Sequence, residues 1–377
     1  MTKQADAPSC DVIVVGAGLA GSAIAVVLAR RGLAVTVVDP YPEFPALFRA
    51  EKIEPDQAAL LQSLGLFDGV QQRTRTINEI IHARAGRILH KRQVEQFGIS
   101  YCDTVNLVRA QIPREVEFLV GKVDALEADA KCPQVVLADG RRIAARLVVV
   151  ATGMNGKLHE QLGIEKRMVQ DELSMAFGFM LERADGQAFP FDAVTYRSDL
   201  ISSRVGYLTL FRMGRLMRAN IFAYWPAKDS ITRELIKYPL PVLARLLPGL
   251  DKVIGDYAVQ GKIEPFRIDL YRMHDCARPG IVLVGDAYQS VCPSTGMGLS
   301  KVLTDVDVLC GNFLFQWLSA GAVPSNAVEN FYDHPRKREV DNLAIKYALD
   351  SRNVVLSPAF QWRLRRKLRA VRFANGW

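Results

Sequence analysis

The stretch DVIVVGAGLAGSAIAVVLARRGLAVTVVDP, residues 11–40, constrains the fold more than any other part of the chain. An apolar run over 11–15 predicts a buried strand, and residues 20–31 have the spacing of a helix that ends at Gly32. The segment LAVTVVD, residues 33–39, predicts a second buried strand. Strand, helix and strand make one βαβ unit with a right-handed crossover, so the N-terminal part is expected to be an α/β domain with a parallel sheet.

The turn of this unit has the pattern G-x-G-x-x-G, formed by Gly16, Gly18 and Gly21. In such a turn the first glycine permits the bend, the second lets a pyrophosphate approach the backbone, and the third allows close packing of helix on strand. We therefore take Gly16, Gly18, Ala20 and Gly21 as candidate cofactor-binding residues. Asp39 ends the second strand, where a carboxylate can accept the hydroxyls of an adenosine ribose and would repel a 2′-phosphate. The site thus favours FAD or NAD over NADP.

A second motif, GDAYQSVCPSTGMG at residues 285–298, follows the apolar run IVLV. Asp286 stands at the end of a predicted strand, where it can hydrogen-bond the ribityl hydroxyls of FAD. A helix that begins near Gly296 can direct its positive end at the flavin edge that gains negative charge on reduction. Gly296 and Gly298 are further candidate cofactor-binding residues. Pro293 is expected near the flavin face. Because NAD has no ribityl chain, the two motifs together predict FAD.

With these motifs in place, the sequence resembles the FAD-dependent monooxygenases of the p-hydroxybenzoate hydroxylase fold, a superfamily that also includes flavin-dependent halogenases and geranylgeranyl reductases. The matching segments are GAGLAG (16–21), VVDP (37–40), FRAEKIEPDQAALLQSLGL (48–66), NLVRAQI (106–112), VVVATG (148–153) and GIVLVGDAYQSVCPSTGMGL (280–299). The resemblance implies that Arg49 and Arg109 also hold FAD.

The same resemblance implies the fold class and the domains. It is α/β: a Rossmann-like FAD-binding βαβ domain with an inserted, mostly antiparallel β-sheet substrate domain and C-terminal helices. Residues 1–76, 98–171 and 265–320 would form the discontinuous FAD-binding domain. Residues 77–97 and 172–264 would form the substrate-binding sheet, with one helix around 229–247. Residues 321–377 would be a helical basic segment.

The expected reaction is hydroxylation of an aromatic or related natural-product substrate, with O2 as co-substrate, NAD(P)H as electron donor and a flavin C4a-hydroperoxide as the oxygen-transferring species. One feature departs from the family pattern. Hydroxylases of this fold carry an acid after the strand at 147–151, and this chain has Thr152 there. The resemblance therefore supports FAD binding more directly than reduction by NAD(P)H.

Three other functions stay open at this stage. A reductase of the geranylgeranyl-reductase type would share FAD and the GD motif. A flavin-dependent halogenase would carry W-x-W-x-I-P, for which the chain has only YWPAK at 224–228. A flavin-binding protein without turnover is the third. Substrate-binding candidates by position alone are aromatic residues of the middle sheet, although such residues more often pack a core: Tyr196, Phe211, Phe222, Tyr224 and Trp225.

The excess of positive charge indicates which binding partners the chain could have. The net charge is +8, and residues 360–377 hold six basic residues and no acid. Leu364, Leu368 and Val371 would form one apolar stripe on a helix there. That helix could pack on the body, adsorb to an anionic membrane surface, or dock a carrier protein that presents an aromatic or lipid-like substrate. We expect no nucleic-acid partner, no metal site and no membrane span, and a cytoplasmic protein with possible peripheral membrane association.

Overall fold

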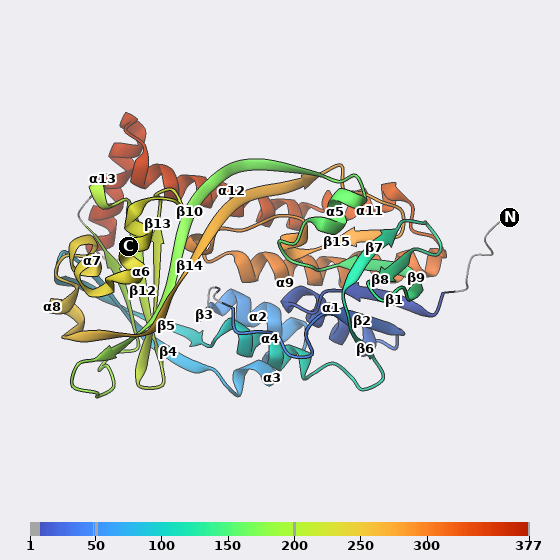
Figure 1. The fold of residues 1–377 in the computed structure, drawn as a ribbon, viewed down its shortest axis with the longest axis horizontal. Coiled ribbons are helices and arrows are strands. Elements are labelled where there is room, and N and C mark those ends of the chain that lie inside the picture. Colours follow the sequence, from blue (N-terminus) through green and yellow to red (C-terminus); the bar gives the residue numbers. More distant parts are fainter. Residues whose placement is uncertain (1–7, 48, 50–51, 199–200, 376–377) are drawn as a thin grey trace.

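The predicted βαβ unit lies at the centre of a parallel sheet in the computed structural model, which describes residues 8–47, 49, 52–198 and 201–375 (Figure 1). The parallel strands run in the order β6-β2-β1-β9-β15. Their bounds are β1 Cys10–Val15, β2 Val35–Asp39, β6 Glu117–Val120, β9 Arg142–Val150 and β15 Ile281–Leu283. Helix α1 (Leu19–Ala29) connects β1 to β2. Nearly every residue of β1, β2 and α1 is buried, as the continuous apolar runs predict.

Smaller elements complete this first half of the molecule. The strands β7 (Val123–Glu127) and β8 (Gln134–Leu137) form an antiparallel extension on the first part of β9. Helix α2 (Pro55–Ser63) begins with a proline at its first turn, where a missing N–H costs no helical hydrogen bond. The other helices here are α3 (Phe67–Gln71), α4 (Tyr101–Arg109) and α5 (Lys157–Gln161).

The second sheet is mostly antiparallel and has the strand order β14-β10-β13-β12-β11-β4-β5-β3, with β11 and β4 parallel. Its bounds are β3 Lys52–Ile53, β4 Arg75–Arg84, β5 Arg87–Gly98, β10 Glu165–Arg183, β11 Ala193–Arg197, β12 Val205–Met213, β13 Leu216–Ala223 and β14 Tyr257–His274. The paired strands β10 and β14 reach from this sheet across to the parallel one (Figure 1). The proposed domain boundaries near residues 171 and 265 therefore fall inside two continuous strands.

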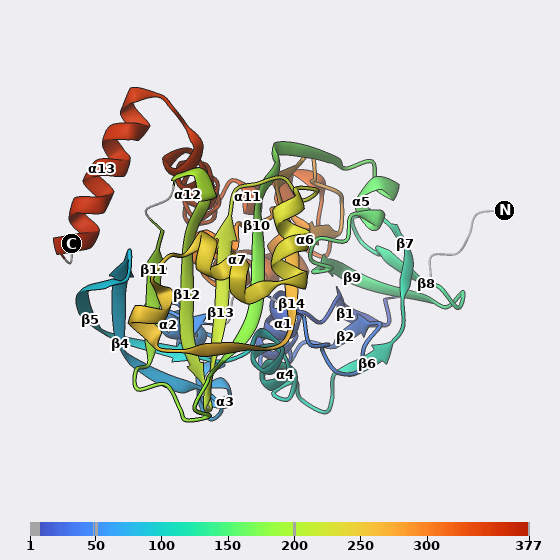
Figure 2. The same ribbon diagram turned by 60° about the vertical axis from the view of Figure 1, so that its left-hand side comes forward.

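Three short helices cover the outer face of the second sheet (Figure 2). They are α6 (Ser230–Lys237), α7 (Pro239–Leu246) and α8 (Leu250–Ile254). The single helix expected around 229–247 is thus two helices. The chain bends at Tyr238, whose φ and ψ are −132° and 64°, because Pro239 has no N–H to continue the helix and starts a new one instead.

The chain returns to the parallel sheet through β15 and then enters helices. Short turns at Gly285–Ala287 and Pro293–Thr295 lead to α9 (Gly298–Val308). A π-helical turn at Leu309–Phe313 separates α9 from α10 (Leu314–Ala320). Helices α11 (Ser325–Tyr332), α12 (Pro335–Leu356) and α13 (Phe360–Asn375) complete the chain.

Helix α13 stands beside the second sheet and projects from the body (Figure 2). Arg366 fastens its start by donating hydrogen bonds to the carbonyls of Val354 and Ser357. The outward side presents Phe360, Leu364 and Leu368, which are 79%, 46% and 53% exposed. The described part of the predicted apolar stripe therefore faces solvent instead of packing on the body. The side chain of Val371, its third member, lies outside the described residues.

Candidate functional site

The turn between β1 and α1 shows why its three glycines differ in role. Gly16 has φ of 96°, and a Cβ there would lie 2.6 Å from the carbonyl oxygen of Ala151. A Cβ on Gly21 would lie 1.9 Å from the carbonyl oxygen of Gly16. Gly18 has an ordinary φ of −66°, and no atom lies within 4 Å of the position of its Cβ. The first and third glycines therefore serve packing, whereas Gly18 borders open space at a helix N-terminus, where an anion can bind.

Asp39, at the end of β2, is fixed on the floor of this space. Its Oδ2 accepts a hydrogen bond from the N–H of Ala17 at 2.7 Å, and its Oδ1 accepts one from the N–H of Tyr41 at 2.9 Å. The carboxylate keeps further lone pairs for a ligand, since each oxygen can accept more than one hydrogen bond. Its position fits the ribose contact that the sequence predicts.

Arg109, at the end of α4, contacts Asp39 and the backbone of the same turn. Its guanidinium lies 3.2 Å from Oδ1 of Asp39 and donates to the carbonyls of Ala17 and Tyr41. Arg109 is absent from the linings of both cavities described below. In this structure it positions Asp39, and direct contact between Arg109 and FAD stays a prediction.

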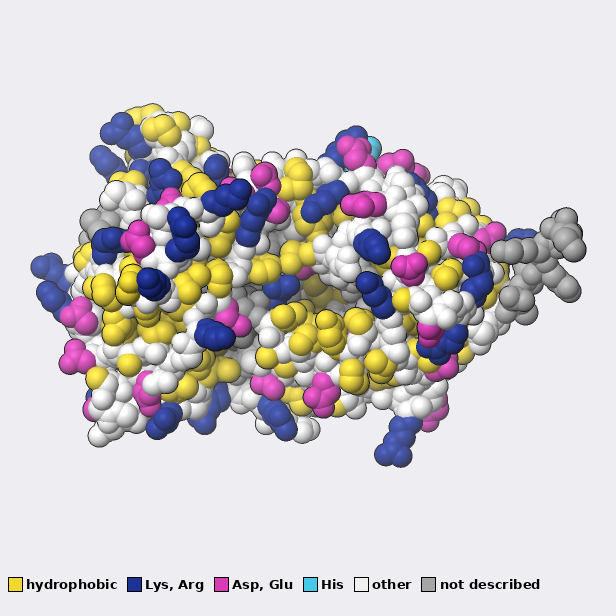
Figure 3. Space-filling view, in the orientation of Figure 1, with side chains coloured by type: hydrophobic (Ala, Val, Ile, Leu, Met, Phe, Trp, Pro, Cys, Tyr) yellow, Lys and Arg dark blue, Asp and Glu magenta, His cyan; other side chains and the backbone are white. Residues whose placement is uncertain are grey.

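A cavity of about 600 Å³ opens above this turn. Its lining includes Gly16, Gly18, Ala20, Asp39 and Thr152. Thr152 follows β9 at the position where an acid was expected, and its hydroxyl donates to the carbonyl of Asn155 at 3.4 Å. A second cavity, of about 430 Å³, lies between α9 and the second sheet. Figure 3 shows the hollow near the middle of the molecule.

Asp286 stands where the two cavities adjoin. Five residues line both of them: Leu19, Arg49, Tyr101, Asp286 and Val302. Burial raises the pKa of the Asp286 carboxyl, and the nearby positive charges of Lys301 and Arg49 oppose that shift. Among the described residues, none donates a hydrogen bond to this carboxylate. This half-buried carboxylate lines both cavities and can accept hydrogen bonds from the hydroxyls of a ligand, so the contact to a ribityl chain stays a prediction that its position allows.

The loop after Asp286 forms one wall of the smaller cavity. Pro293, Gly296 and Gly298 all line it. The turn Pro293–Thr295 ends at Gly296, whose φ is 70°, and α9 begins only at Gly298. The helix therefore starts two residues later than the predicted position near Gly296, and Gly296 belongs to the turn before it.

A buried charge cluster behind this loop was not predicted. Lys301 and Asp305 lie one turn apart on α9, and Lys337 and Asp341 lie one turn apart on α12. All four side chains are at most 2% exposed. Lys301 also donates to the carbonyl of Gly285 at 3.0 Å. The only signal in the sequence is the Lys-to-Asp spacing of four residues in both segments, which usually marks an exposed pair.

The second sheet supplies the opposite wall of the smaller cavity. Residues of β4, β5, β11, β12 and β13 line it, most of them at alternate positions along their strand, and they include Phe211 and Phe222. Tyr196 does not line it: its side chain faces the other side of β11, is fully buried, and accepts a hydrogen bond from the N–H of Gly86. The correction follows from strand geometry, because neighbouring residues of a strand face opposite ways.

Two other aromatic candidates also lie off the cavity lining. Tyr224 directly follows β13, and its hydroxyl lies 3.5 Å from the Oγ of Ser294 in the cavity wall. Trp225 packs in the core beneath α6, where its indole N–H donates to Thr232 at 3.0 Å. Of the aromatic candidates, Phe211 and Phe222 are therefore the two that border the cavity directly.

Comparisons with known proteins identify the ligand of this arrangement. Residues 9–316 match the FAD binding domain family. The chain belongs to this family. It is therefore an FAD-dependent oxidoreductase, and its relatives and structural neighbours favour monooxygenation over the alternative functions. Three residues fit FAD. Gly18 leaves its backbone open to a pyrophosphate, Asp39 presents a fixed carboxylate to a ribose, and Asp286 presents a carboxylate to which no described residue donates a hydrogen bond.

The individual relatives are of low identity, and they include both hydroxylases and a reductase. The chain is 25% identical to the ubiquinone hydroxylase UbiL of Rhodospirillum rubrum over 79% of this chain and 71% of that one. It is 26% identical to digeranylgeranylglycerophospholipid reductase 1 of Methanopyrus kandleri over 85% and 81%. The crystal structure of p-nitrophenol 4-monooxygenase PnpA from Pseudomonas putida DLL-E4 superposes with a TM-score of 0.74 at 18% identity, over 94% of this chain and 91% of that one. That likeness establishes the fold.

Proposed function

We propose that the protein hydroxylates a small aromatic substrate held between the Pro293–Gly298 loop and the second sheet. The observation that carries the proposal is the pair of adjoining cavities. The larger one borders Gly18 and Asp39, and the smaller one borders the α9 start and a sheet face with Phe211 and Phe222. A volume of about 430 Å³ falls in the range of small-molecule sites.

Separate residues would then bind FAD and surround the substrate. Gly18 and Asp39 would hold the pyrophosphate and ribose of FAD, and Asp286 the ribityl hydroxyls. FAD, when bound, supplies the redox and oxygen chemistry. The start of α9, which lines the smaller cavity at Gly298, would favour negative charge on a flavin bound there, because the N-terminus of a helix carries partial positive charge. Ile80, Phe211 and Phe222 would exclude water from the substrate.

The function is tested on the purified protein. We expect a flavin absorbance spectrum, and oxidation of NADH or NADPH coupled to O2 uptake that rises when an aromatic substrate is added. Anaerobic reoxidation of the reduced protein by a polyprenyl alkene, without O2 uptake, would instead establish the reductase function. Colourless protein that takes up no FAD would contradict both functions.

The outward side of α13 supports peripheral association with an anionic membrane surface. Phe360, Leu364 and Leu368 are exposed there next to the exposed cations Arg363 and Lys367. Exposed apolar and basic residues on one helix are the pattern of interfacial helices. Among the described residues, no helix is both long and apolar enough to cross a bilayer.

Sedimentation with vesicles tests this association. We expect the protein to bind vesicles of phosphatidylglycerol and phosphatidylcholine but not pure phosphatidylcholine, and the double variant Leu364→Glu, Leu368→Glu to lose binding. The matched control is Leu240→Glu, which alters an exposed leucine on α7. If the double variant binds vesicles as well as the wild type does, α13 is not the membrane contact. If the wild-type protein binds an immobilised carrier protein but no vesicles, the exposed side of α13 is a contact for a protein partner instead.

A further inference from the structure

Strand β12 contains a bulge that turns one tyrosine toward the smaller cavity. In the pairing with β13, Val205 lies opposite Ala223 and Tyr207 lies opposite Phe222, so β12 has one extra residue, Gly206, at this point. Residues two apart on a regular strand share a face of the sheet, and an extra residue reverses that rule. Val205 accordingly packs in the core under the helices α6 to α8, whereas Tyr207 lines the cavity.

The bulge depends on a residue without a side chain. A Cβ on Gly206 would lie 3.1 Å from the ring of Tyr224, which is closer than an ordinary van der Waals contact. Beyond the bulge the strand alternates regularly, and Tyr207, Thr209 and Phe211 line the cavity at every second position. The bulge is therefore the reason that a tyrosine, and not a core residue, stands at this place in the wall.

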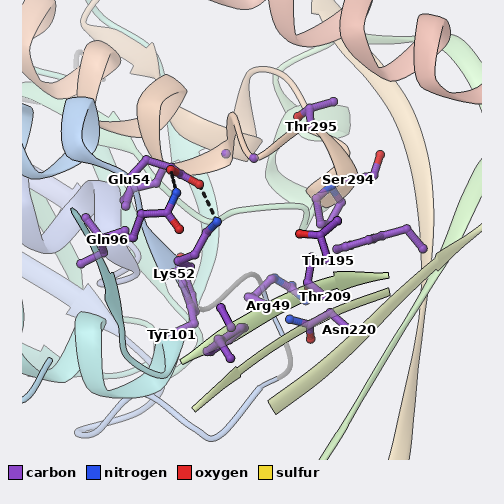
Figure 4. A pocket seen from close by; sticks show the side chains of 18 of the residues that line it. Arg49, Lys52, Glu54, Gln96, Tyr101, Thr195, Thr209, Asn220, Ser294 and Thr295 are labelled. Atoms are coloured by element: carbon purple, nitrogen blue, oxygen red, sulfur yellow. Dashed lines mark hydrogen bonds and ion pairs between the residues drawn. The ribbon is translucent and has the colours of Figure 1, made fainter. Parts of the chain in front are cut away.

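The hydroxyl of Tyr207 reaches the turn that precedes α9. It donates a hydrogen bond to the carbonyl oxygen of Ser294 at 2.6 Å. Ser294 is 7% exposed and belongs to the turn Pro293–Thr295, which leads to the start of α9 at Gly298. Figure 4 shows Ser294 on this turn, above strands of the second sheet whose cavity-lining residues include Thr195, Thr209 and Asn220. A residue of the substrate wall thus holds the backbone of the turn at which the flavin is expected.

The ring of Tyr207 packs within that wall. Its centroid lies 4.9 Å from the ring centroid of Phe222, which also lines the cavity, and 5.3 Å from the guanidinium carbon of Arg197. A tyrosine side chain has only two rotatable angles, so its hydroxyl cannot keep its position when the ring moves. Hydrogen bonds tolerate only a narrow range of length and angle. The position of the ring in the wall and the position of the Ser294 carbonyl are therefore linked.

Two other contacts hold the same loop. Gln57 of α2 donates to the carbonyl of Gly296 at 2.9 Å, from the FAD-binding half of the molecule. Cys292, directly before the turn, is fully buried in a small core cluster that also contains Phe222 and Ala348. The loop is thus held from both halves of the molecule, and a test of Tyr207 has to distinguish its contact from the one that Cys292 makes.

We propose, on the basis of the function proposed above, that Tyr207 is a positioning residue for the flavin. Its hydroxyl fixes the turn Pro293–Thr295, and with it the start of α9, relative to the substrate wall. The positive end of α9 would then lie where it favours the negative charge of a reduced flavin. Without the hydroxyl the turn is less firmly held, so the positive end acts less on the flavin and bound FAD becomes harder to reduce. A change in the wall beside Tyr207 reaches the flavin through the same side chain.

The test measures the reduction potential of bound FAD, without substrate or O2, by equilibration with a reference dye during reduction by dithionite. For Tyr207→Phe we expect the ratio of reduced to oxidised FAD at a fixed potential to fall about tenfold, which is about 30 mV for a two-electron couple. The matched control is Tyr196→Phe, which removes a hydroxyl that donates to the carbonyl of Pro248 on the helix-covered side of the sheet. It should leave the potential unchanged.

A double-mutant cycle traces the path from the wall to the turn. Phe222→Leu removes the ring against which Tyr207 packs, so it should lower the same ratio about threefold in the wild-type background and leave it unchanged in Tyr207→Phe. A path through Cys292 would instead give the same shift in both backgrounds. The unfolding temperature and the amount of bound FAD show that each variant is folded and loaded.

The outcomes separate this inference from the proposed function. Equal shifts in Tyr207→Phe and Tyr196→Phe, or no shift in Tyr207→Phe, would overturn the inference, because Tyr207 would then be a structural residue. An equal shift by Phe222→Leu in both backgrounds would also overturn it, because the wall would then act through Cys292. These measurements need no turnover. They can therefore fail although O2 uptake is coupled to an aromatic substrate, and they can succeed although the protein proves to be a reductase.

Discussion

Oδ2 of Asp305 accepts a hydrogen bond from the backbone N–H of Gly285 at 2.8 Å, which ties helix α9 to the turn that carries Asp286. Lys301 binds the same carboxylate oxygen at 2.8 Å and Lys337 binds the other at 2.7 Å. The position of Asp286 therefore depends on charges that never reach either cavity. The four buried charged residues therefore hold the turn Gly285–Ala287 in place. We expect substitutions in them to weaken FAD retention by lowering the stability of the folded protein.

Replacing Lys337 by Met tests that dependence. The change leaves Asp305 and Asp341 with Lys301 alone, and breaking a buried pair costs about 3–5 kcal/mol. We expect a large fall in the free energy of unfolding, measured in urea, and faster loss of FAD on gel filtration. The neighbour Arg336 pairs with Asp307 at the surface, so Arg336→Gln should change stability by less than about 1 kcal/mol. Equal effects of the two variants would contradict the assigned role.

Two glycines of the first turn should respond in opposite ways to alanine. Gly18→Ala meets open space and keeps an allowed φ, so the apo-protein should unfold at nearly the wild-type temperature while FAD affinity falls more than tenfold. Gly21→Ala meets the carbonyl oxygen of Gly16 and should destabilise the apo-protein itself. Thermal unfolding and FAD titration of both variants measure the contrast. If Gly18→Ala binds FAD with wild-type affinity, the pyrophosphate does not bind at this turn.

Asp286→Asn should separate stability from cofactor binding. Burial raises the pKa of Asp286, so the folded apo-protein holds the proton more strongly than the unfolded chain does. The wild type therefore loses stability as the pH rises from the ordinary carboxyl pKa through the raised pKa of the folded protein, above which the loss is complete. The charges of Lys301 and Arg49 reduce this effect, and the charge of Asp305 adds to it. We expect the variant apo-protein to unfold at a higher temperature than wild type at pH 8, by a margin that shrinks towards pH 4.

The same variant should bind FAD at least tenfold more weakly at pH 8, because an amide is a weaker acceptor for the ribityl hydroxyls than a carboxylate. Fluorescence titration with FAD measures the affinity. A variant that is less stable than wild type at pH 8, with its cofactor affinity intact, would show that Asp286 is a structural residue.

Tyr196→Phe should alter stability and leave the substrate unaffected. The hydroxyl accepts from Gly86 and donates to the carbonyl of Pro248, both on the helix-covered side of the sheet. Its loss should cost about 1 kcal/mol of unfolding free energy with KM within twofold of wild type. Phe222→Leu, which removes part of the cavity wall, should shift KM several-fold, and it should also lower stability because Phe222 packs in a core cluster. If Tyr196→Phe changes KM as much as Phe222→Leu does, Tyr196 contributes to substrate binding, which would contradict its assignment to the scaffold.

Local chemistry explains which parts of the site could be predicted. The roles proposed for the glycine turn, Asp39 and Asp286 depend on residues adjacent in sequence, and Gly18, Asp39 and Asp286 all line a cavity in the structure. Thr195 and Asn220 could not be found in the same way. Which residues of a strand face the cavity depends on pairing register, and β12 shifts its register between Val205 and Tyr207. The sequence also carries no signal that the i, i+4 charges of α9 and α12 meet each other.

The alternation of the second sheet has a consequence for how such a chain can change. On β11, β12 and β13 the side chains that meet the cavity are interleaved with those that pack under α6, α7 and α8. A substitution at Thr195, Thr209 or Asn220 therefore alters one surface while the next residue along keeps the scaffold intact. New substrate preferences can arise by single steps on one side of the sheet, and a combinatorial library confined to those positions would sample them without first having to restore foldability.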